Sequence, residues 1–109
     1  MARRRVMYIE HKNGPSELTG DARIGSVTFS KSGNSIHYNG TTFVRGNGFK
    51  ANYFEVGTGN SYWISGCKKN GDDRLYGERL PILIDDDVRE EYWVDIRNLP
   101  DQKHLARIN

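Results

Sequence analysis

The sequence holds one cysteine and three histidines, the residue types that most often combine in nucleophilic catalysis. A thiolate attacks an electrophilic carbon readily when a nearby imidazole has taken the thiol proton. Cys67 could form such a pair with His11, His37 or His104, and the two lysines that follow it would favour its thiolate form. The residues around Cys67 match no recognisable nucleophile motif, so we favour a structural or incidental cysteine over a catalytic one.

A run of three carboxylates, Asp85-Asp86-Asp87, is the second feature that could carry chemistry. Consecutive carboxylates can hold Mg²⁺, but they also stabilise the positive N-terminal end of a helix. A helical pattern begins at Asp86 and no phosphate-binding motif accompanies the run, so we interpret it as helix capping. The histidines lack the spacing of zinc ligands, and Gly46–Gly48 and Gly57–Gly59 resemble turns more than phosphate loops. The sequence therefore predicts no metal site and no cofactor.

An aromatic segment followed by lysines is the feature that most favours binding. Aromatic rings beside cations are what single-stranded nucleic acid requires for base stacking and phosphate contact. The same residues serve equally well as anchors and charged rim of a protein interface. The third interpretation places the aromatic side chains in the core and the lysines in solvent. The predicted binding residues are Tyr53, Tyr62, Trp63, Ile64, Lys68, Lys69, Asp73 and Arg74.

Two turns fix the register of the strands that precede this segment. Asn39-Gly40 is typical of a type I′ hairpin turn, which pairs Tyr38 with Thr41 and Ile36 with Phe43. A second turn around residues 32–33 pairs Phe29 with Ile36 and Val27 with Tyr38. Both registers place the same apolar residues on one face of a three-stranded meander. These are Val27, Phe29, Ile36, Tyr38 and Phe43.

The aromatic segment itself is predicted to be a hairpin, with strands at 51–56 and 61–65. A tip at Thr58-Gly59 pairs Phe54 with Trp63 and Glu55 with Tyr62. Both faces are then aromatic, so the hairpin either lies between two layers or presents one face to a partner. One face carries Phe54, Val56 and Trp63, and the other carries Tyr53, Glu55, Tyr62 and Ile64.

The remaining elements lie at the two ends of the chain. A first strand at Val6–Glu10 places Val6, Tyr8 and Glu10 on one face and Met7 and Ile9 on the other. A last short strand follows at 81–84. From Asp86 the apolar spacing changes to three and four residues through Leu99, which predicts an amphipathic helix closed by Pro100. We expect residues 101–109 to fray.

At 109 residues the chain has the length of one domain, 1–109, and we expect an ordered core at about 5–99. The predicted fold class is α+β: a bent antiparallel sheet or small β-barrel of six or seven short strands with one C-terminal helix. The basic N-terminus is followed by only four apolar residues, so we expect no signal peptide, no membrane span and a cytoplasmic location. A formal net charge of +2 permits nucleic-acid binding without requiring it.

Several segments are similar to a family of short bacterial proteins of unknown function. They include Arg5–Glu10, Ala22–Lys31, Tyr62–Arg74 and Ile84–Trp93, and the resemblance extends from about Arg5 to Arg97. Some members carry the label 1-deoxyxylulose-5-phosphate synthase, an activity that requires a much longer chain and a thiamine diphosphate site. The resemblance therefore implies no catalytic residues.

Three functions follow, in order of preference. The first is a non-enzymatic binding module that contacts another protein or a second copy of itself through the predicted binding residues. The alternative is single-stranded nucleic-acid binding through the same aromatic and basic residues together with Arg3–Arg5. The least favoured is a small enzyme that uses Cys67.

Overall fold

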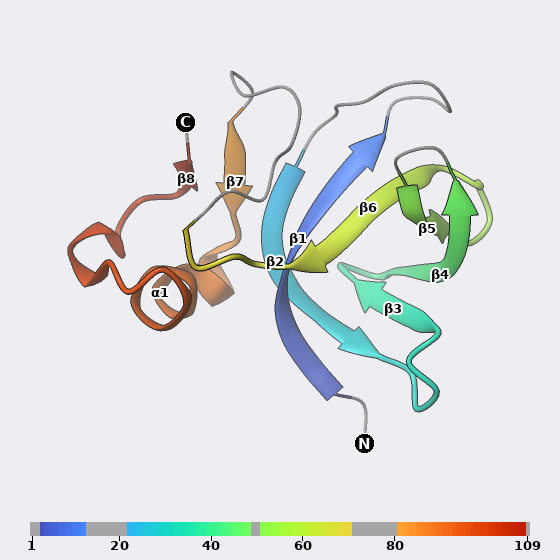
Figure 1. The fold of residues 1–109 in the computed structure, drawn as a ribbon, viewed down its shortest axis with the longest axis horizontal. Coiled ribbons are helices and arrows are strands. Elements are labelled where there is room, and N and C mark those ends of the chain that lie inside the picture. The colour runs from blue at the N-terminus through green and yellow to red at the C-terminus, as the bar shows by residue number, and fades with distance from the viewer. Residues whose placement is uncertain (1–2, 13–21, 49–50, 71–80, 109) are drawn as a thin grey trace.

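The computed structural model describes residues 3–12, 22–48, 51–70 and 81–108, which form eight strands and a short helical segment (Figure 1). The strands are β1 (Arg3–Lys12), β2 (Ala22–Phe29), β3 (Ser35–Tyr38), β4 (Thr41–Gly48), β5 (Ala51–Glu55), β6 (Ser61–Gly66), β7 (Ile82–Ile84) and β8 (Arg107–Ile108).

Six of the strands close into a barrel. They follow the order β1-β6-β5-β4-β3-β2, and β2 then pairs with β1, so that every neighbouring pair in the ring is antiparallel. Closure pairs most of the edges of these strands within the molecule. The predicted bent sheet or small barrel is thus confirmed in its barrel form, but the described residues form eight strands in place of the six or seven predicted, because β7 and β8 add to the outside of the ring.

Strand β2 belongs to the barrel and to a second, smaller layer. Its C-terminal residues pair with β3, whereas Ala22–Ile24 pair in parallel with β7, and β8 adds to β7 in antiparallel fashion. Figure 1 shows β1 and β2 in the middle, with β3 to β6 on one side and β7, β8 and the helical segment on the other. Two layers therefore share one pair of strands.

Two hydrophobic clusters result from this arrangement, because successive residues of a strand point to opposite faces. On β1, Met7 and Ile9 point into the barrel while Val6 and Tyr8 point outward, which confirms the predicted division of these residues between two faces. The interior cluster consists of Met7, Ile9, Val27, Phe29, Ile36, Phe43, Tyr53 and Ile64. The outer cluster consists of Val6, Tyr8, Ala22, Ile24, Ile82, Ile84, Val88, Tyr92 and Trp93.

The meander predicted from the two turns is confirmed in most of its register. Tyr38 pairs with Thr41, and Ile36 pairs with both Phe43 and Phe29. Asn39 adopts a φ of 49° and Gly40 a φ of 79°, as a type I′ turn requires. The ladder between β2 and β3 ends at Thr28 and His37, so the predicted pairing of Val27 with Tyr38 is absent from it.

The predicted register of the aromatic hairpin is wrong by two residues. Tyr53 pairs with Tyr62 and Phe54 with Ser61. The turn is longer than the predicted Thr58-Gly59 tip, because the amide of Glu55 donates to the carbonyl of Asn60 at 2.9 Å. A shift of two residues keeps each side chain on its face, so the predicted division of the hairpin into two faces survives.

The predicted helix begins at Asp86 but is irregular. A 3₁₀ turn at Asp86–Val88 leads into α1 (Arg89–Glu91) and then a π turn at Tyr92–Ile96. Its apolar residues pack on the outer cluster as the pattern indicated. The tail does not fray as expected: it forms a turn at Pro100–Gln102 and then β8, and Ile108 packs against the outer cluster. None of the helical segments described is long and apolar enough to cross a membrane.

Candidate binding groove

The side chains of the hairpin that are predicted to bind a partner are divided between the barrel interior and the outer layer. Tyr53 is 4% exposed and Ile64 is 2% exposed, both inside the barrel. Tyr62 and Trp63 are half-buried on opposite faces of β6: Tyr62 packs against the interior cluster and Trp63 against the outer one. These four side chains therefore do not form one surface.

The charged members of the predicted set are split between the described residues and the rest of the chain. Lys68 and Lys69 follow β6 and are exposed. Asp73 and Arg74 lie outside the residues that the structure describes. Of the predicted binding residues, the two lysines are the ones that the structure places fully at the surface.

A split in the barrel wall creates a different candidate site. On β2, Gly25–Val27 lie between the segment that pairs with β7 and the segment that pairs with β3. The ring of Tyr38 lies across this gap, so close to Gly25 that a Cβ there would be 2.4 Å from the Tyr38 Cε1 atom. Gly25 is therefore required for the approach of Tyr38 to β2.

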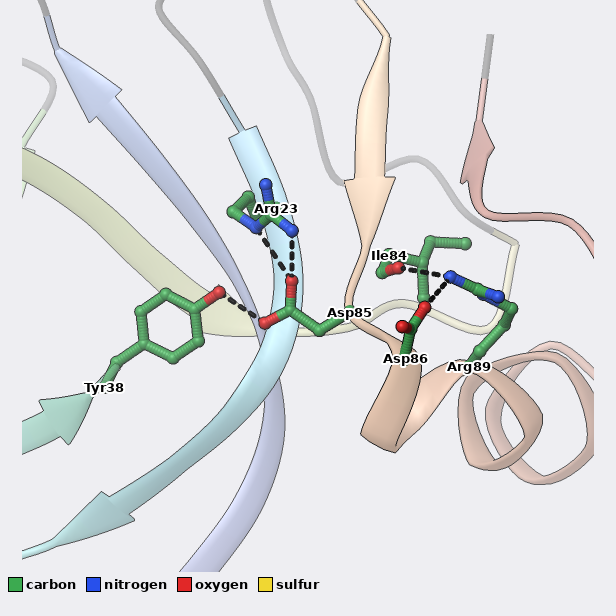
Figure 2. Close-up of polar contacts among 6 residues, drawn as sticks. All are labelled: Arg23, Tyr38, Ile84, Asp85, Asp86 and Arg89. Carbon is green, nitrogen blue, oxygen red and sulfur yellow. Dashed lines mark hydrogen bonds and ion pairs between the residues drawn. The ribbon is translucent and has the colours of Figure 1, made fainter. Parts of the chain in front are cut away.

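Three polar side chains bridge the split, as Figure 2 shows. The Tyr38 hydroxyl donates to Asp85 Oδ2 at 2.5 Å, and Arg23 Nε donates to Asp85 Oδ1 at 2.7 Å. A second Arg23 nitrogen lies 2.7 Å from the same oxygen. We call these contacts the Asp85 bridge. It connects the β3–β4 turn of the barrel to the segment that follows β7.

The electrostatics of the Asp85 bridge fix the protonation of its donors. Burial, and then the hydrogen bond to Asp85, raise the pKa of Tyr38 well above its ordinary value. The hydrogen bond to Asp85 also raises the pKa of Arg23. Tyr38 is therefore a neutral donor and Arg23 a permanent cation over the physiological range.

The Asp85 bridge lies in a groove of about 780 Å³. Leu83 and Ala106 form an apolar wall on the β7–β8 side, and Tyr38 and Asn39 face it from the β3–β4 turn. Arg89 donates to Asp86 and to the Ile84 carbonyl (Figure 2). This Asp85 groove is lined by Arg23, Ser26, Tyr38, Asn39, Leu83, Ile84, Asp85, Asp86, Asp87, Arg89 and Ala106.

A second cavity, of about 250 Å³, adjoins the groove at the end of the barrel. Its aromatic lining is ordered: Tyr62 stacks on His11 at 4.9 Å between ring centroids and meets Phe43 edge-on at 4.6 Å. This mouth pocket is lined by Ile9, His11, Arg23, Tyr38, Asn39, Thr41, Phe43 and Tyr62. Arg23, Tyr38 and Asn39 line both cavities, which are therefore adjacent.

The chain matches no family model, no curated protein and no solved structure. The resemblance to short bacterial proteins thus stays a prediction.

The three aspartates lie at the start of the helical segment as predicted, with Asp86 and Asp87 in its first turn, but their capping role is corrected for Asp85. Asp85 occupies the N-cap position but makes no capping hydrogen bond with its side chain, because its carboxylate turns to Arg23 and Tyr38. Asp86 pairs instead with Arg89. The contact between Arg23 and Asp85 spans 62 residues of sequence, and no local spacing signals such a pair.

Three of the residues considered for catalysis, Cys67, His11 and His37, each contact a different part of the structure. Cys67 is half-buried and packs against the outer cluster. His11 stacks on Tyr62, and the His37 ring bonds to the Thr42 hydroxyl at 3.0 Å. Within the described ranges, no group of three or more histidine, cysteine or acidic side chains is placed to hold a metal ion.

Proposed function

We propose that this chain is a non-catalytic protein-binding module whose partner occupies the Asp85 groove and the mouth pocket. The observation that carries the proposal is that two cavities meet at Tyr38 and Arg23, two side chains already held in place by Asp85. A site whose side chains are fixed before binding loses less conformational entropy when the partner arrives.

The chemistry of the groove supports binding over catalysis. Both oxygens of Asp85 already accept hydrogen bonds, one from Arg23 and one from Tyr38, so the carboxylate holds these two side chains in place. The raised pKa of Tyr38 makes its hydroxyl a poor proton donor in a reaction. These groups orient a partner better than they transfer protons.

The charges of the groove indicate which partner fits. Arg23 and Arg89 are each paired with an aspartate, while Asp87 is exposed and has no ion pair among the residues described. The surplus is negative, so the groove attracts a lysine or arginine side chain and repels nucleic-acid phosphates. The wall of Leu83 and Ala106 and the rings of the mouth pocket suit an apolar or aromatic neighbour of that basic residue.

A random heptapeptide library displayed on phage and selected on the folded protein tests this proposal. We expect recovered peptides to carry a basic residue beside an apolar or aromatic one, and to compete with one another for a single site. Asp87→Asn should weaken their binding about two- to fivefold, the value of one exposed charge pair.

Asp101→Asn is the matched control, because Asp101 is also exposed but lies in the Pro100–Gln102 turn and lines neither cavity. The Asp101→Asn variant should bind the selected peptides with the affinity of the wild type. Peptides without basic residues, or equal losses in both variants, would contradict the proposal. Tight binding of oligothymidine in place of peptides would favour the nucleic-acid alternative.

A further inference from the structure

Strand β1 has an open edge at its N-terminal end. It pairs with β2 from Arg3 to Glu10, but with β6 only from Met7 to Lys12. Strand β6 ends at Gly66, and the chain then turns toward the helical segment while β1 continues to the N-terminus (Figure 1). Within the described part of the chain, Arg3–Val6 therefore have a strand partner on one side only.

The side chains of this segment leave the open edge uncovered. The guanidinium of Arg3 lies over the Phe29 ring, 4.8 Å from its centroid. Arg5 lies where a side chain of Gly66 would be, since a Cβ there would be 2.5 Å from an Arg5 nitrogen. Because a Cβ points to the face of a strand and not to its edge, Arg5 covers a face of β6. Arg3, Arg4 and Arg5 are exposed, whereas Val6 is 5% exposed, so the accessible part of the open edge is Arg3–Arg5.

The open edge is also positively charged. Arg3, Arg4 and Arg5 are all exposed, and Arg4 alone has a carboxylate partner among the described residues, Glu91 at 3.1 Å. Lys69 is exposed beyond the end of β6, where its carbonyl accepts a hydrogen bond from Arg97. Arg3 and Arg5 thus have charges that no described acidic side chain compensates.

We propose that the open edge of β1 binds an extended acidic segment of a partner protein, which adds to the sheet as a further strand. Main-chain hydrogen bonds to the exposed segment Arg3–Arg5 would provide the affinity, and carboxylates beside Arg3 and Arg5 would select the partner segment. This surface shares no residue with the Asp85 groove, so the inference stands independently of the proposed function.

A second copy of this chain is a poor occupant of the edge. Antiparallel pairing of two β1 strands would bring the three arginines of each copy against those of the other, and like charges across a strand pair are destabilising. An acidic strand would instead place carboxylates opposite these arginines, and opposite charges across a strand pair attract. The charge on the edge thus selects a different partner and opposes self-association.

The test uses two labelled peptides, (Glu-Val)₄ and (Lys-Val)₄, titrated into the full chain and followed by fluorescence anisotropy. We expect binding of the acidic peptide alone, with an affinity that falls as salt increases. In amide hydrogen exchange, the acidic peptide should protect amides within residues 3–5. The double variant Arg3→Gln/Arg5→Gln should weaken binding about fivefold, while Lys31→Gln, an exposed control in the β2–β3 turn, should leave it unchanged.

Two proline variants separate edge addition from simple charge attraction. Successive amides of a strand point to opposite edges, so the amides of Arg4 and Arg5 face different neighbours. Of the variants Arg4→Pro and Arg5→Pro, one therefore removes a β1–β2 hydrogen bond and the other removes a donor of the open edge. We expect one variant to be destabilised and the other to fold but lose the acidic peptide. Undiminished binding to the folded variant, or no peptide binding at all, would overturn the proposal. Oligothymidine binding without amide protection would instead indicate a phosphate-binding surface and would overturn it equally.

Discussion

The two hydrophobic clusters share β1 and β2 but are built from contacts of different range. Inside the barrel, hairpins joined by short turns bring together residues that are close in sequence, and the long-range β1–β6 ladder closes the ring. The outer cluster depends on β7, β8 and the helical segment, which pack on strands about 60 to 100 residues away in the chain. The interior is thus closed on all sides by strands, whereas the outer layer is attached through a three-residue and a two-residue strand.

Matched core truncations give the largest expected effect and can break this comparison. Ile36 is fully buried in the interior cluster and Ile84 is 2% exposed in the outer one, so each change to alanine should cost about 2–5 kcal/mol of unfolding free energy. We expect Ile36→Ala to destabilise the whole molecule, and Ile84→Ala to release the outer layer first.

Both tryptophans report on the outer layer, because Trp93 belongs to its cluster and Trp63 packs against it. Urea unfolding followed by tryptophan fluorescence and by far-UV circular dichroism therefore distinguishes the layers. For Ile84→Ala the fluorescence transition should come at lower urea than the circular dichroism transition. Coincident transitions in both variants would show that the two clusters form one cooperative unit.

The same difference in range explains what the sequence could and could not predict. The Asn39-Gly40 turn specifies its pairs locally, and the β3–β4 hairpin is correct. The β5–β6 register failed because Gly57 and Gly59, both at positive φ, permit a longer loop than the predicted tip. No turn signal links β2 to β7, so neither their parallel pairing nor the contact of Arg23 with Asp85 could be derived.

The candidate sites were harder to predict than the fold for the same reason. The sequence predicts Tyr62 as a binding residue beside the lysines, whereas the structure places it in the lining of the mouth pocket, away from them. Tyr38 was assigned to the core, and it does pack against the interior cluster. Its hydroxyl, however, extends beyond the end of the β2–β3 ladder and donates a hydrogen bond to Asp85. A site formed between layers depends on how the layers meet, which the spacing of residues does not encode.

Two glycine substitutions compare the junction of the two layers, at Gly25, with a hairpin of the barrel, at Gly46. A Cβ at Gly25 would lie 2.4 Å from Tyr38 and 2.7 Å from Asp85, and one at Gly46 would lie 2.5 Å from the Phe54 ring. Tyr38 is held by the Asp85 bridge, whereas the half-buried ring of Phe54 has no polar group that could tie it to a neighbour. Gly25→Ala should therefore cost about 1–3 kcal/mol, and Gly46→Ala less than about 1 kcal/mol. Equal losses in thermal or urea unfolding would mean that the bridge does not hold Tyr38 in place.

Tyr38→Phe removes the hydrogen bond to Asp85, the contact that ties the β3–β4 turn to the outer layer. At neutral pH we expect a loss of about 1 kcal/mol in unfolding free energy, because a hydroxyl that donates to a partly buried carboxylate is lost while the ring remains. Urea unfolding of both proteins at pH 7 measures this difference.

The pH dependence of that difference tests the bridge more directly. The pKa of Tyr38 is raised in the folded protein, so the folded state keeps its phenolic proton where the unfolded state loses it. Stabilisation by Tyr38 is complete below the unfolded pKa of about 10 and falls as pH rises above it. Tyr62, whose pKa is also raised, is present in both proteins and its effect cancels. The stability curves of wild type and Tyr38→Phe should therefore converge between about pH 10 and 11. A constant gap over that range would mean that Tyr38 ionises equally in both states, and hence that burial and Asp85 do not restrain its proton in solution.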